Sequence, residues 1–413
     1  MSLLNTDYPV QLTHNGQAVE AAEIGARQLA VLNPDGFACA RDEISQWPGY
    51  KPSPLYELDA VSRTLGVGGV WYKDESERFG LGSFKALGGA YAVVRLLKRE
   101  LVSRGICNNE PSTQALLDGV YRGHLREIVI TCATDGNHGR SVAWGCQLFG
   151  CGCVIYIHAT VSEGRRKAIA AYGADVVRVP GNYDDAVRQA AKDAAELGRF
   201  VVSDTSYPGY MAVPRDVMQG YTLMAEEAFN QLPKGIIPTH IFLQGGVGGL
   251  AAAVTAQAWI RYGHQRPRCV VVEPDQAACL YESANRGEPV VVHGELDTLM
   301  AGLACGEVSL LAWDVLSEGA SDFMTVTDDA AVDCMRLMAD GRACHHHPLV
   351  AGESAVAGMA GLILAGQRDE LRNALGLNAD SQVLLIGSEG ATDPELYTQL
   401  VGRSAEAVLG ETV

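Results

Sequence analysis

The chain has 413 residues, of which 47% are hydrophobic and 20% are charged, as is typical of a globular protein with a large core. The length favours two domains, or one large domain with an insert. Acidic residues (49) outnumber lysine and arginine (32), and the net charge of −17 would repel phosphate backbones and anionic membranes. We therefore expect no nucleic-acid partner and no membrane association. The first residues lack the basic and apolar regions of a signal peptide, so we expect a cytoplasmic protein.

Short apolar, β-branched runs alternate with longer amphipathic stretches along most of the chain. This pattern predicts βα units around a mainly parallel sheet. The predicted strands are Ile128–Ala133, Val154–His158, Val176–Val179, Phe200–Val202, His240–Leu243, Cys269–Val272, Met324–Val326 and Val383–Ile386. Glu163–Tyr172 and Asp184–Leu197 are predicted helices. The first fifty residues are less periodic, and we expect them to wrap the surface or an oligomer interface.

Lys85 is one of only seven lysines, and small residues surround it in Gly80-Leu81-Gly82-Ser83-Phe84-Lys85-Ala86-Leu87-Gly88-Gly89. The small residues would let a flat ligand approach the start of a helix closely. A lysine amine can form an imine with an aldehyde and can move a proton at a substrate carbon. An exposed helix lysine beside a glycine-rich loop is an equally good reading of this segment alone.

Two further loops lie between a predicted strand and a predicted helix. In Thr134-Asp135-Gly136-Asn137-His138-Gly139, the glycines free the backbone to bind a carboxylate, and Asn137 can hydrogen-bond a phenolic oxygen. The alternative is an Asx turn with a helix cap. In Gly245-Gly246-Val247-Gly248-Gly249, successive N–H groups at a helix N-terminus form a natural cradle for a phosphate. That loop lacks the dinucleotide spacing and the Walker lysine.

The eleven cysteines show no Cys-x-x-Cys spacing, so we expect most of them to be small buried residues. Cys151-Gly152-Cys153 and Cys344-His345-His346-His347 carry zinc-type ligands, but the first lies in a strand-like run and the second in an apparent loop. We expect no metal. Cys279 and Cys305 are candidates for proximity in space.

The lysine, the asparagine loop and the glycine loop, in this order, resemble the fold type II pyridoxal-phosphate enzymes, a group that includes threonine and serine dehydratases. The resemblance extends from about Tyr72 to Pro394. It implies an α/β fold of two open domains with mainly parallel twisted sheets and the active site between them. The large cofactor-binding domain would comprise 1–100 and 213–413, and the small α/β domain 101–212. Relatives are commonly dimers, which implies a homodimer.

Carried over by position, the resemblance assigns the binding of pyridoxal 5′-phosphate. Lys85 would hold the cofactor as a Schiff base, and Asn137 would lie near its O3′. The amides of Gly245, Gly246, Val247, Gly248 and Gly249 would bind the phosphate. Ser388, in Gly387-Ser388-Glu389-Gly390, would hydrogen-bond the pyridine nitrogen. Met218-Gln219-Gly220-Tyr221 resembles a Gly-Gln-Gly-Thr segment of the dehydratases, with tyrosine in place of threonine.

Asp135 departs from the dehydratases, which typically have serine at this position. In a partly desolvated pocket, its carboxylate would attract a substrate with a second ammonium group and disfavour a neutral hydroxyl substrate. With Asp135 and three further segments, the chain resembles the 2,3-diaminopropionate ammonia-lyases. The segments are Glu77-Arg78-Phe79-Gly80-Leu81, Met300-Ala301-Gly302-Leu303-Ala304-Cys305-Gly306-Glu307 and Ser388-Glu389-Gly390-Ala391-Thr392-Asp393-Pro394.

That resemblance implies α,β-elimination of D- and L-2,3-diaminopropionate through an aminoacrylate to pyruvate and two ammonia. Lys85 would take the proton from the L substrate and Asp135 from the D substrate. Asp204, which matches another acidic residue of the family, would hold the distal ammonium, although a turn cap is nearly as good a reading. The expected substrate-binding residues are Thr134, Asp135, Gly136, His138 and Asp204.

Three alternatives remain open at this point. The nearest is a serine or threonine dehydratase that tolerates Asp135. A second is a non-catalytic ligand-binding protein of the same fold, and a third is a metal or nucleotide enzyme that uses the histidine run.

Overall fold

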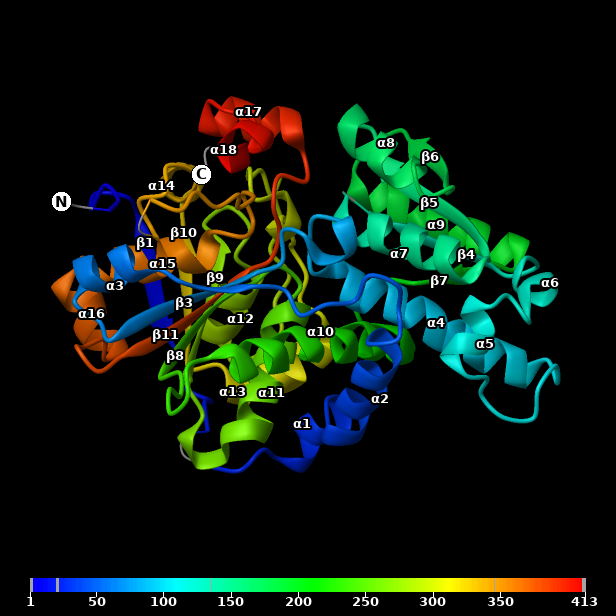
Figure 1. Ribbon diagram of the computed structural model, residues 1–413, viewed down its shortest axis with the longest axis horizontal. Coiled ribbons are helices and arrows are strands. Elements are labelled where there is room, and N and C mark those ends of the chain that lie inside the picture. The colour runs from blue at the N-terminus through cyan, green and yellow to red at the C-terminus, as the bar shows by residue number, and fades with distance from the viewer. Residues whose placement is uncertain (1–2, 20–21, 135, 345, 411–413) are drawn as a thin grey trace. The chain divides into compact units, whose positions relative to one another are not determined.

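The computed structural model describes residues 3–19, 22–134, 136–344 and 346–410 (Figure 1). Contacts divide the chain into two compact units. Unit 1 comprises residues 1–33, 52–83 and 224–413, and unit 2 comprises residues 34–51 and 84–223. Each unit contains its own sheet.

Among the described residues, unit 1 has a seven-stranded sheet in the order β1-β10-β9-β8-β11-β3-β2. The central strands run parallel, whereas the edge strands β1 and β2 run antiparallel to β10 and β3. Every residue of β8 and β10 is buried, as expected for strands covered on both faces. The strands are β1 (Val10–His14), β2 (Leu55–Glu57), β3 (Gly69–Asp74), β8 (His240–Gln244), β9 (Arg268–Pro274), β10 (Asp322–Val326) and β11 (Gln382–Gly387).

The described part of unit 2 has a parallel four-stranded sheet in the order β6-β5-β4-β7. The strands are β4 (Val129–Ala133), β5 (Gly152–His158), β6 (Asp175–Val179) and β7 (Phe200–Val201). The helices of this unit are α2 (Pro34–Ile44), α4 (Lys85–Ser103), α5 (Thr113–Leu117), α6 (Arg122–Leu125), α7 (Asn137–Phe149), α8 (Glu163–Ala170) and α9 (Tyr183–Leu197). The long helix α10 (Ala212–Gln231) continues from unit 2 into unit 1.

The helices of unit 1 surround its larger sheet. The α-helices are α1 (Ala26–Val31), α3 (Asp59–Leu65), α11 (Gly249–Tyr262), α12 (Cys279–Arg286), α13 (Leu310–Gly319), α14 (Asp328–Ala339), α15 (Ala357–Gly366), α16 (Asp369–Leu375), α17 (Pro394–Val401) and α18 (Ala405–Gly410). Short 3₁₀ turns are η1 (Arg78–Gly80), η2 (Gly263–Gln265) and η3 (Ala301–Leu303).

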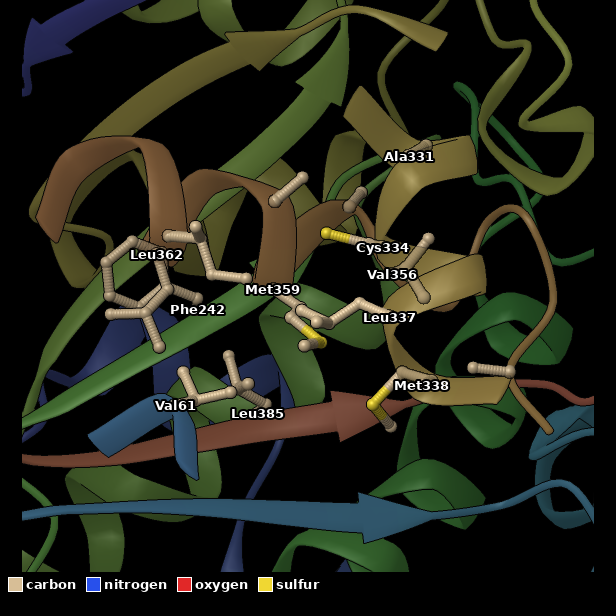
Figure 2. Close-up of a cluster of buried hydrophobic side chains, with 14 of the residues drawn as sticks. Val61, Phe242, Ala331, Cys334, Leu337, Met338, Val356, Met359, Leu362 and Leu385 are labelled. Carbon is tan, nitrogen blue, oxygen red and sulfur yellow. The ribbon is translucent and has the colours of Figure 1, made fainter. Parts of the chain in front are cut away.

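The core of unit 1 forms where α14 and α15 pack on the sheet (Figure 2). Met359 and Leu362 of α15 lie beside Phe242 of β8, and the whole of α15 before Gly366 is buried. A Cβ atom at Gly358 would lie 2.9 Å from the Phe242 carbonyl oxygen, so glycine lets this helix approach the strand closely. Continuous burial of such apolar side chains supplies most of the driving force for folding of this unit.

All eight predicted strands are confirmed, as β4 to β11, and the two predicted helices correspond to α8 and α9. The prediction missed β1, β2 and β3. The expectation that the first fifty residues wrap the surface or an interface is wrong for Val10–His14, because these residues pair in register with β10 as a strand of the sheet. The residues of this edge strand are half-buried or exposed and none is buried, which explains its weak periodicity.

The two units do not coincide with the expected domains at 1–100 plus 213–413 and at 101–212. The helix α4 packs against α7, and α2 packs against α4, which places both helices with the smaller sheet. The domain boundaries and the placement of an active site between the domains stay predictions. No helix in the described ranges is both long and apolar enough to cross a membrane.

Candidate active site

Lys85 is the first residue of α4, and it forms an ion pair with Asp204 in the segment after β7. Lys85 Nζ lies 2.6 Å from Asp204 Oδ2, and the two side chains are only 19% and 17% exposed. Burial is the largest effect and acts to raise the pKa of Asp204, but the lowering effects, led by the Lys85 ammonium, together hold that pKa well below its usual range. The structure thus brings together two of the residues predicted for the site.

The small residues that follow Lys85 serve helix packing. A Cβ atom at Gly88 would lie 2.3 Å from the Tyr221 ring, and one at Gly89 would lie 2.2 Å from Ser141 Oγ. On the facing helix α10, a Cβ atom at Gly220 would lie 1.9 Å from the Leu87 carbonyl oxygen. The glycines therefore let α4 approach α7 and α10, whereas the sequence had suggested room for a flat ligand.

Tyr221 is a neighbour of Lys85 that the predicted site did not include. Its ring lies 4.6 Å from that of Phe84 between centroids, and Lys85 Nζ lies 5.9 Å from its centroid. Burial raises the pKa of the phenol well above its usual range, so the hydroxyl stays protonated. The replacement of threonine by tyrosine was the only sequence signal for this position.

The loop between β4 and α7 is shaped by Thr134. Its buried hydroxyl accepts hydrogen bonds from the N–H groups of Gly136 (3.1 Å) and Gly139 (3.0 Å). A Cβ atom at Gly139 would lie 2.3 Å from Thr134 Cγ2, which explains why glycine occupies that position. Thr134 therefore caps the start of α7, and its predicted role in substrate binding stays a prediction.

Asn137 is the first residue of α7 and is half-buried, so its side chain can contact a ligand at the N-terminus of this helix. Asp135 lies outside the described residues, so its predicted roles as base and substrate ligand stay predictions. His138, the next buried residue of the loop, lies with its Nδ1 3.8 Å from Asp204 Oδ2 and its Nε2 2.8 Å from the Val202 carbonyl oxygen. The loop and the segment after β7 thus converge.

The glycine loop joins β8 to α11, and Gly246 and Gly248 adopt positive φ angles of 65° and 95°. Gly245 donates its N–H to the Val272 carbonyl (2.9 Å), and Gly248 donates to the Gly245 carbonyl (3.3 Å). In the described structure these two amides are therefore engaged. The N–H groups of Gly246, Val247 and Gly249 are the ones that a phosphate can use here.

Glu273, at the end of β9, packs beneath this loop. A Cβ atom at Gly245 would lie 2.3 Å from its Cγ, and its carboxyl accepts N–H bonds from Leu280 (3.1 Å) and Tyr281 (2.7 Å). Burial raises the pKa of Glu273 to about 8. The sequence analysis did not identify this carboxyl, because a glutamate that ends a strand carries no signal of its burial.

Ser388 follows β11 directly and is buried. Gly387, the last residue of that strand, has no room for a side chain, because a Cβ atom there would lie 2.1 Å from the Tyr72 ring. Glu389 Oε1 accepts the Ser354 N–H (3.1 Å), which fixes the turn. Ser388 is thus the hydroxyl that this turn offers to a ligand, and its role toward a pyridine nitrogen stays a prediction.

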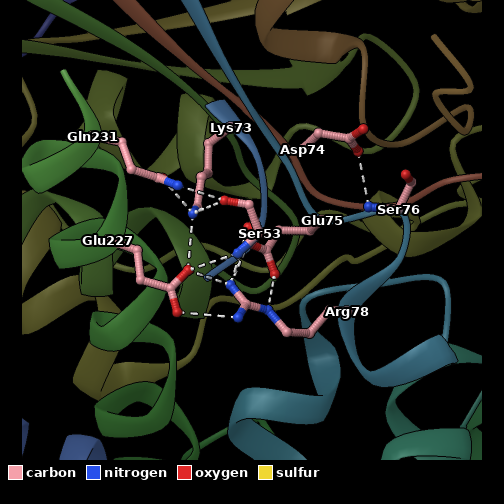
Figure 3. A network of polar contacts seen from close by, with 8 residues as sticks. All are labelled: Ser53, Lys73, Asp74, Glu75, Ser76, Arg78, Glu227 and Gln231. Atoms are coloured by element: carbon pink, nitrogen blue, oxygen red, sulfur yellow. Dashed lines mark hydrogen bonds and ion pairs between the residues drawn. The ribbon is translucent and has the colours of Figure 1, made fainter. Parts of the chain in front are cut away.

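A buried ionic network supports the segment that leads to α4 (Figure 3). Lys73 donates to Glu227 Oε2 (2.8 Å), Gln231 Oε1 (2.8 Å) and the Ser53 carbonyl (2.7 Å). Arg78 contacts the carboxylates of Glu75 (2.7 Å) and Glu227 (2.6 Å). Two cations face two carboxylates, as charges this deeply buried require.

The described residues contain no group of three histidine, cysteine or acidic side chains that could hold a metal ion, and His345 of the histidine run lies outside them. The eleven cysteines carry thiols rather than disulfides. Cys279 is close enough to Cys305 for the two thiols to interact electrostatically. Cys279 also points its Sγ at the Gly246 carbonyl oxygen, 3.5 Å away.

The residues present fit pyridoxal 5′-phosphate. Lys85 supplies an amine, the loop Gly245–Gly249 supplies backbone N–H groups with positive φ angles at Gly246 and Gly248, and Ser388 supplies a buried hydroxyl. Residues 46–389 match the model of the pyridoxal-phosphate dependent enzyme family. A diaminopropionate ammonia-lyase of Salmonella typhimurium is 40% identical over 369 residues, which cover 87% of this chain and 90% of that protein.

Solved structures agree with this match. The holo diaminopropionate ammonia-lyase of Escherichia coli superposes with a TM-score of 0.85 at 35% identity, covering 95% of this chain and 97% of that one. The same enzyme in complex with an aminoacrylate-PLP azomethine reaction intermediate also gives 0.85, at 34% identity and with coverage of 96% and 97%. These likenesses confirm the predicted fold type II architecture.

Proposed function

We propose a reaction for this chain from its family, because it belongs to the pyridoxal-phosphate-dependent enzymes and within them to the diaminopropionate ammonia-lyases. In this reaction, 2,3-diaminopropionate and water are converted to pyruvate and two ammonia. The observation that carries the proposal is the Lys85–Asp204 pair, which sets a carboxylate beside the amine expected to hold the cofactor. A diamino acid brings a second ammonium that such a carboxylate can hold.

When bound, pyridoxal 5′-phosphate supplies an electron sink that acidifies the substrate Cα–H. Lys85 would anchor the cofactor and, once released, take the Cα proton of the L substrate, the role that the family resemblance assigns to it. Asp135 would take the proton of the D substrate from the opposite face. Gly246, Val247 and Gly249 would hold the phosphate, Asn137 would lie beside O3′, and Ser388 would meet the pyridine nitrogen.

Asp204 would bind the distal ammonium of the substrate. In the described structure its partner is the Lys85 ammonium at 2.6 Å. Binding of the cofactor by Lys85 would remove that cation from the carboxylate. A buried carboxylate without a cation is costly, so the site would favour a substrate that brings one.

A substrate comparison tests the proposal against a serine or threonine dehydratase. The purified holoenzyme should turn over 2,3-diaminopropionate with a kcat/KM at least about 100-fold above that for serine or threonine, because a neutral hydroxyl leaves the buried carboxylate unpaired. Coupled detection of the keto acid product gives the rates. Faster turnover of either hydroxy amino acid would overturn the proposal in favour of the dehydratase.

We also propose a cytoplasmic homodimer. Eleven cysteines that remain thiols suit a reducing compartment, and members of the resembling family are commonly dimers. Light scattering coupled to gel filtration should give about twice the 44.0 kDa chain mass. A mass equal to one chain at micromolar concentration would contradict the dimer.

A further inference from the structure

The hydrogen bonding of His138 fixes the tautomer of its ring. Nε2 lies 2.8 Å from the Val202 carbonyl oxygen, and a carbonyl can only accept, so Nε2 carries the proton. Burial, the largest effect, lowers the pKa of the imidazole and keeps the ring neutral. Nδ1 therefore presents a lone pair.

That lone pair faces a second acceptor. Nδ1 is buried, and among the described residues it has no hydrogen-bond partner. It lies 3.8 Å from Asp204 Oδ2, which is too far for a hydrogen bond between the two side chains. Two acceptors that face each other in a buried site are unfavourable unless a donor group lies against both.

An ammonium group fits this arrangement. It carries three donors, and the Lys85 ammonium already lies 2.6 Å from the same Oδ2. We propose that His138 Nδ1 and Asp204 Oδ2 together form the subsite for the distal ammonium of the substrate, with His138 as a residue that determines specificity. This inference rests on the proposed function and specifies how the leaving group is held.

The chemistry of the pair explains discrimination between leaving groups. Burial lowers the pKa of His138, and the distal ammonium would take the place of the Lys85 ammonium that holds the pKa of Asp204 low, so the substrate ammonium keeps its proton. When the Cβ–N bond breaks, its electron pair stays on nitrogen, which leaves as neutral ammonia without a proton from the protein. A hydroxyl would need a proton to leave as water, and neither acceptor supplies one. The buried phenol of Tyr221 is a poor acid, because burial raises its pKa.

Two substitutions of His138 separate its two nitrogens. His138→Gln keeps an N–H near the Nε2 position and removes the Nδ1 acceptor, whereas His138→Asn keeps an acceptor near the Nδ1 position and removes the donor to Val202. Each holoenzyme is assayed with 2,3-diaminopropionate and with β-chloroalanine, whose chloride leaves without a proton and carries no ammonium.

The measured quantity is kcat/KM for 2,3-diaminopropionate divided by that for β-chloroalanine. We expect this ratio to fall about 10- to 100-fold in His138→Gln, as for loss of a hydrogen bond to a charged group, and to fall less than about 3-fold in His138→Asn. Equal losses on both substrates in His138→Gln would overturn the inference but leave the proposed function intact. A wild-type enzyme that eliminates chloride but not ammonia would overturn both.

A readout independent of turnover protects the test if a variant does not fold. Long-range ¹H–¹⁵N spectra of holoenzyme labelled at its ten histidines report the tautomer of each ring. We expect His138 to stay neutral with its proton on Nε2 at pH values that protonate the exposed histidines, and its signal is identified by its loss in whichever variant folds or by its contact with Val202. His240, which is also buried and directs its Nε2 at the Leu375 carbonyl, gives a second neutral signal that both variants retain. A proton on Nδ1, or a doubly protonated ring at neutral pH, would overturn the inference.

Discussion

Lys85 and Asp204 are separated by 119 positions in the sequence, yet their charged atoms are 2.6 Å apart. The sequence predicted both residues for the site, because each lies in a motif with a fixed order along the chain. It did not predict their contact, which depends on how α4 packs beside the end of β7. Tyr221 was missed for the same reason, since a buried tyrosine is an ordinary core residue until its neighbours are known.

Glu273 gives the clearest pH dependence at the scale of one residue. Its pKa rises from 4.5 to about 8 because of burial, so the folded chain binds this proton more tightly than the unfolded chain. The stability that it contributes is complete below about pH 4.5 and is lost as the pH rises through about 8. Glu273→Gln cannot ionise and should escape this loss.

The measurement is the free energy of unfolding of both holoproteins between pH 5 and 9. From pH 5 to 9 the wild type should lose a few kcal/mol relative to Glu273→Gln. Parallel pH profiles of the two proteins would show that Glu273 does not titrate in this range. The N–H groups of Leu280 and Tyr281 bond to different oxygens of Glu273, and glutamine keeps only one of them, so the comparison uses the change of stability with pH and not its absolute value.

At the scale of elements, strands buried in the middle of the sheets were predictable and strands with charged ends were not. Apolar runs such as β8 and β11 stand out in the sequence because both faces are covered. The strand β3 ends in Lys73 and Asp74, which resemble a loop in the sequence. Lys73 can be buried because the carboxylate of Glu227 on α10 pairs with its ammonium, and Glu227 is far from Lys73 in the sequence.

The network of Lys73, Glu75, Arg78 and Glu227 should be strongly coupled (Figure 3). Glu227→Gln leaves two buried cations facing one carboxylate and should cost about 3 to 5 kcal/mol of unfolding free energy. Lys73→Met removes one cation. The double variant restores the balance of charge, so it should be less destabilised than the sum of the single variants by about 1 to 3 kcal/mol.

Urea denaturation of the four proteins measures this coupling. If the effects of Lys73→Met and Glu227→Gln add within about 0.5 kcal/mol, Lys73 and Glu227 contribute to stability independently and the expected coupling is absent. The network holds the segment from Glu75 to Arg78, which precedes Lys85 and α4. Absorbance of the bound cofactor should therefore be compared in the same four proteins.

For the whole molecule, the alternation of strand and helix patterns predicted an α/β architecture with mainly parallel sheets, which the topology confirms. The extent of the units was harder to predict, because α2 and α4 join the smaller sheet through packing alone. The order of lysine, asparagine loop and glycine loop indicated the family, since three separate segments must agree. The approach of His138 Nδ1 to Asp204 Oδ2, the oxygen that contacts the Lys85 ammonium, became visible only with the fold.

The most direct test of the proposed activity is the stoichiometry of products from each enantiomer of 2,3-diaminopropionate. Pyruvate and ammonia are measured in the same reaction of the holoenzyme. We predict two ammonia per pyruvate from both the D and the L substrate, with the enzyme turning over each to completion. Ammonia release without pyruvate, or no reaction with either enantiomer, would contradict the proposed elimination.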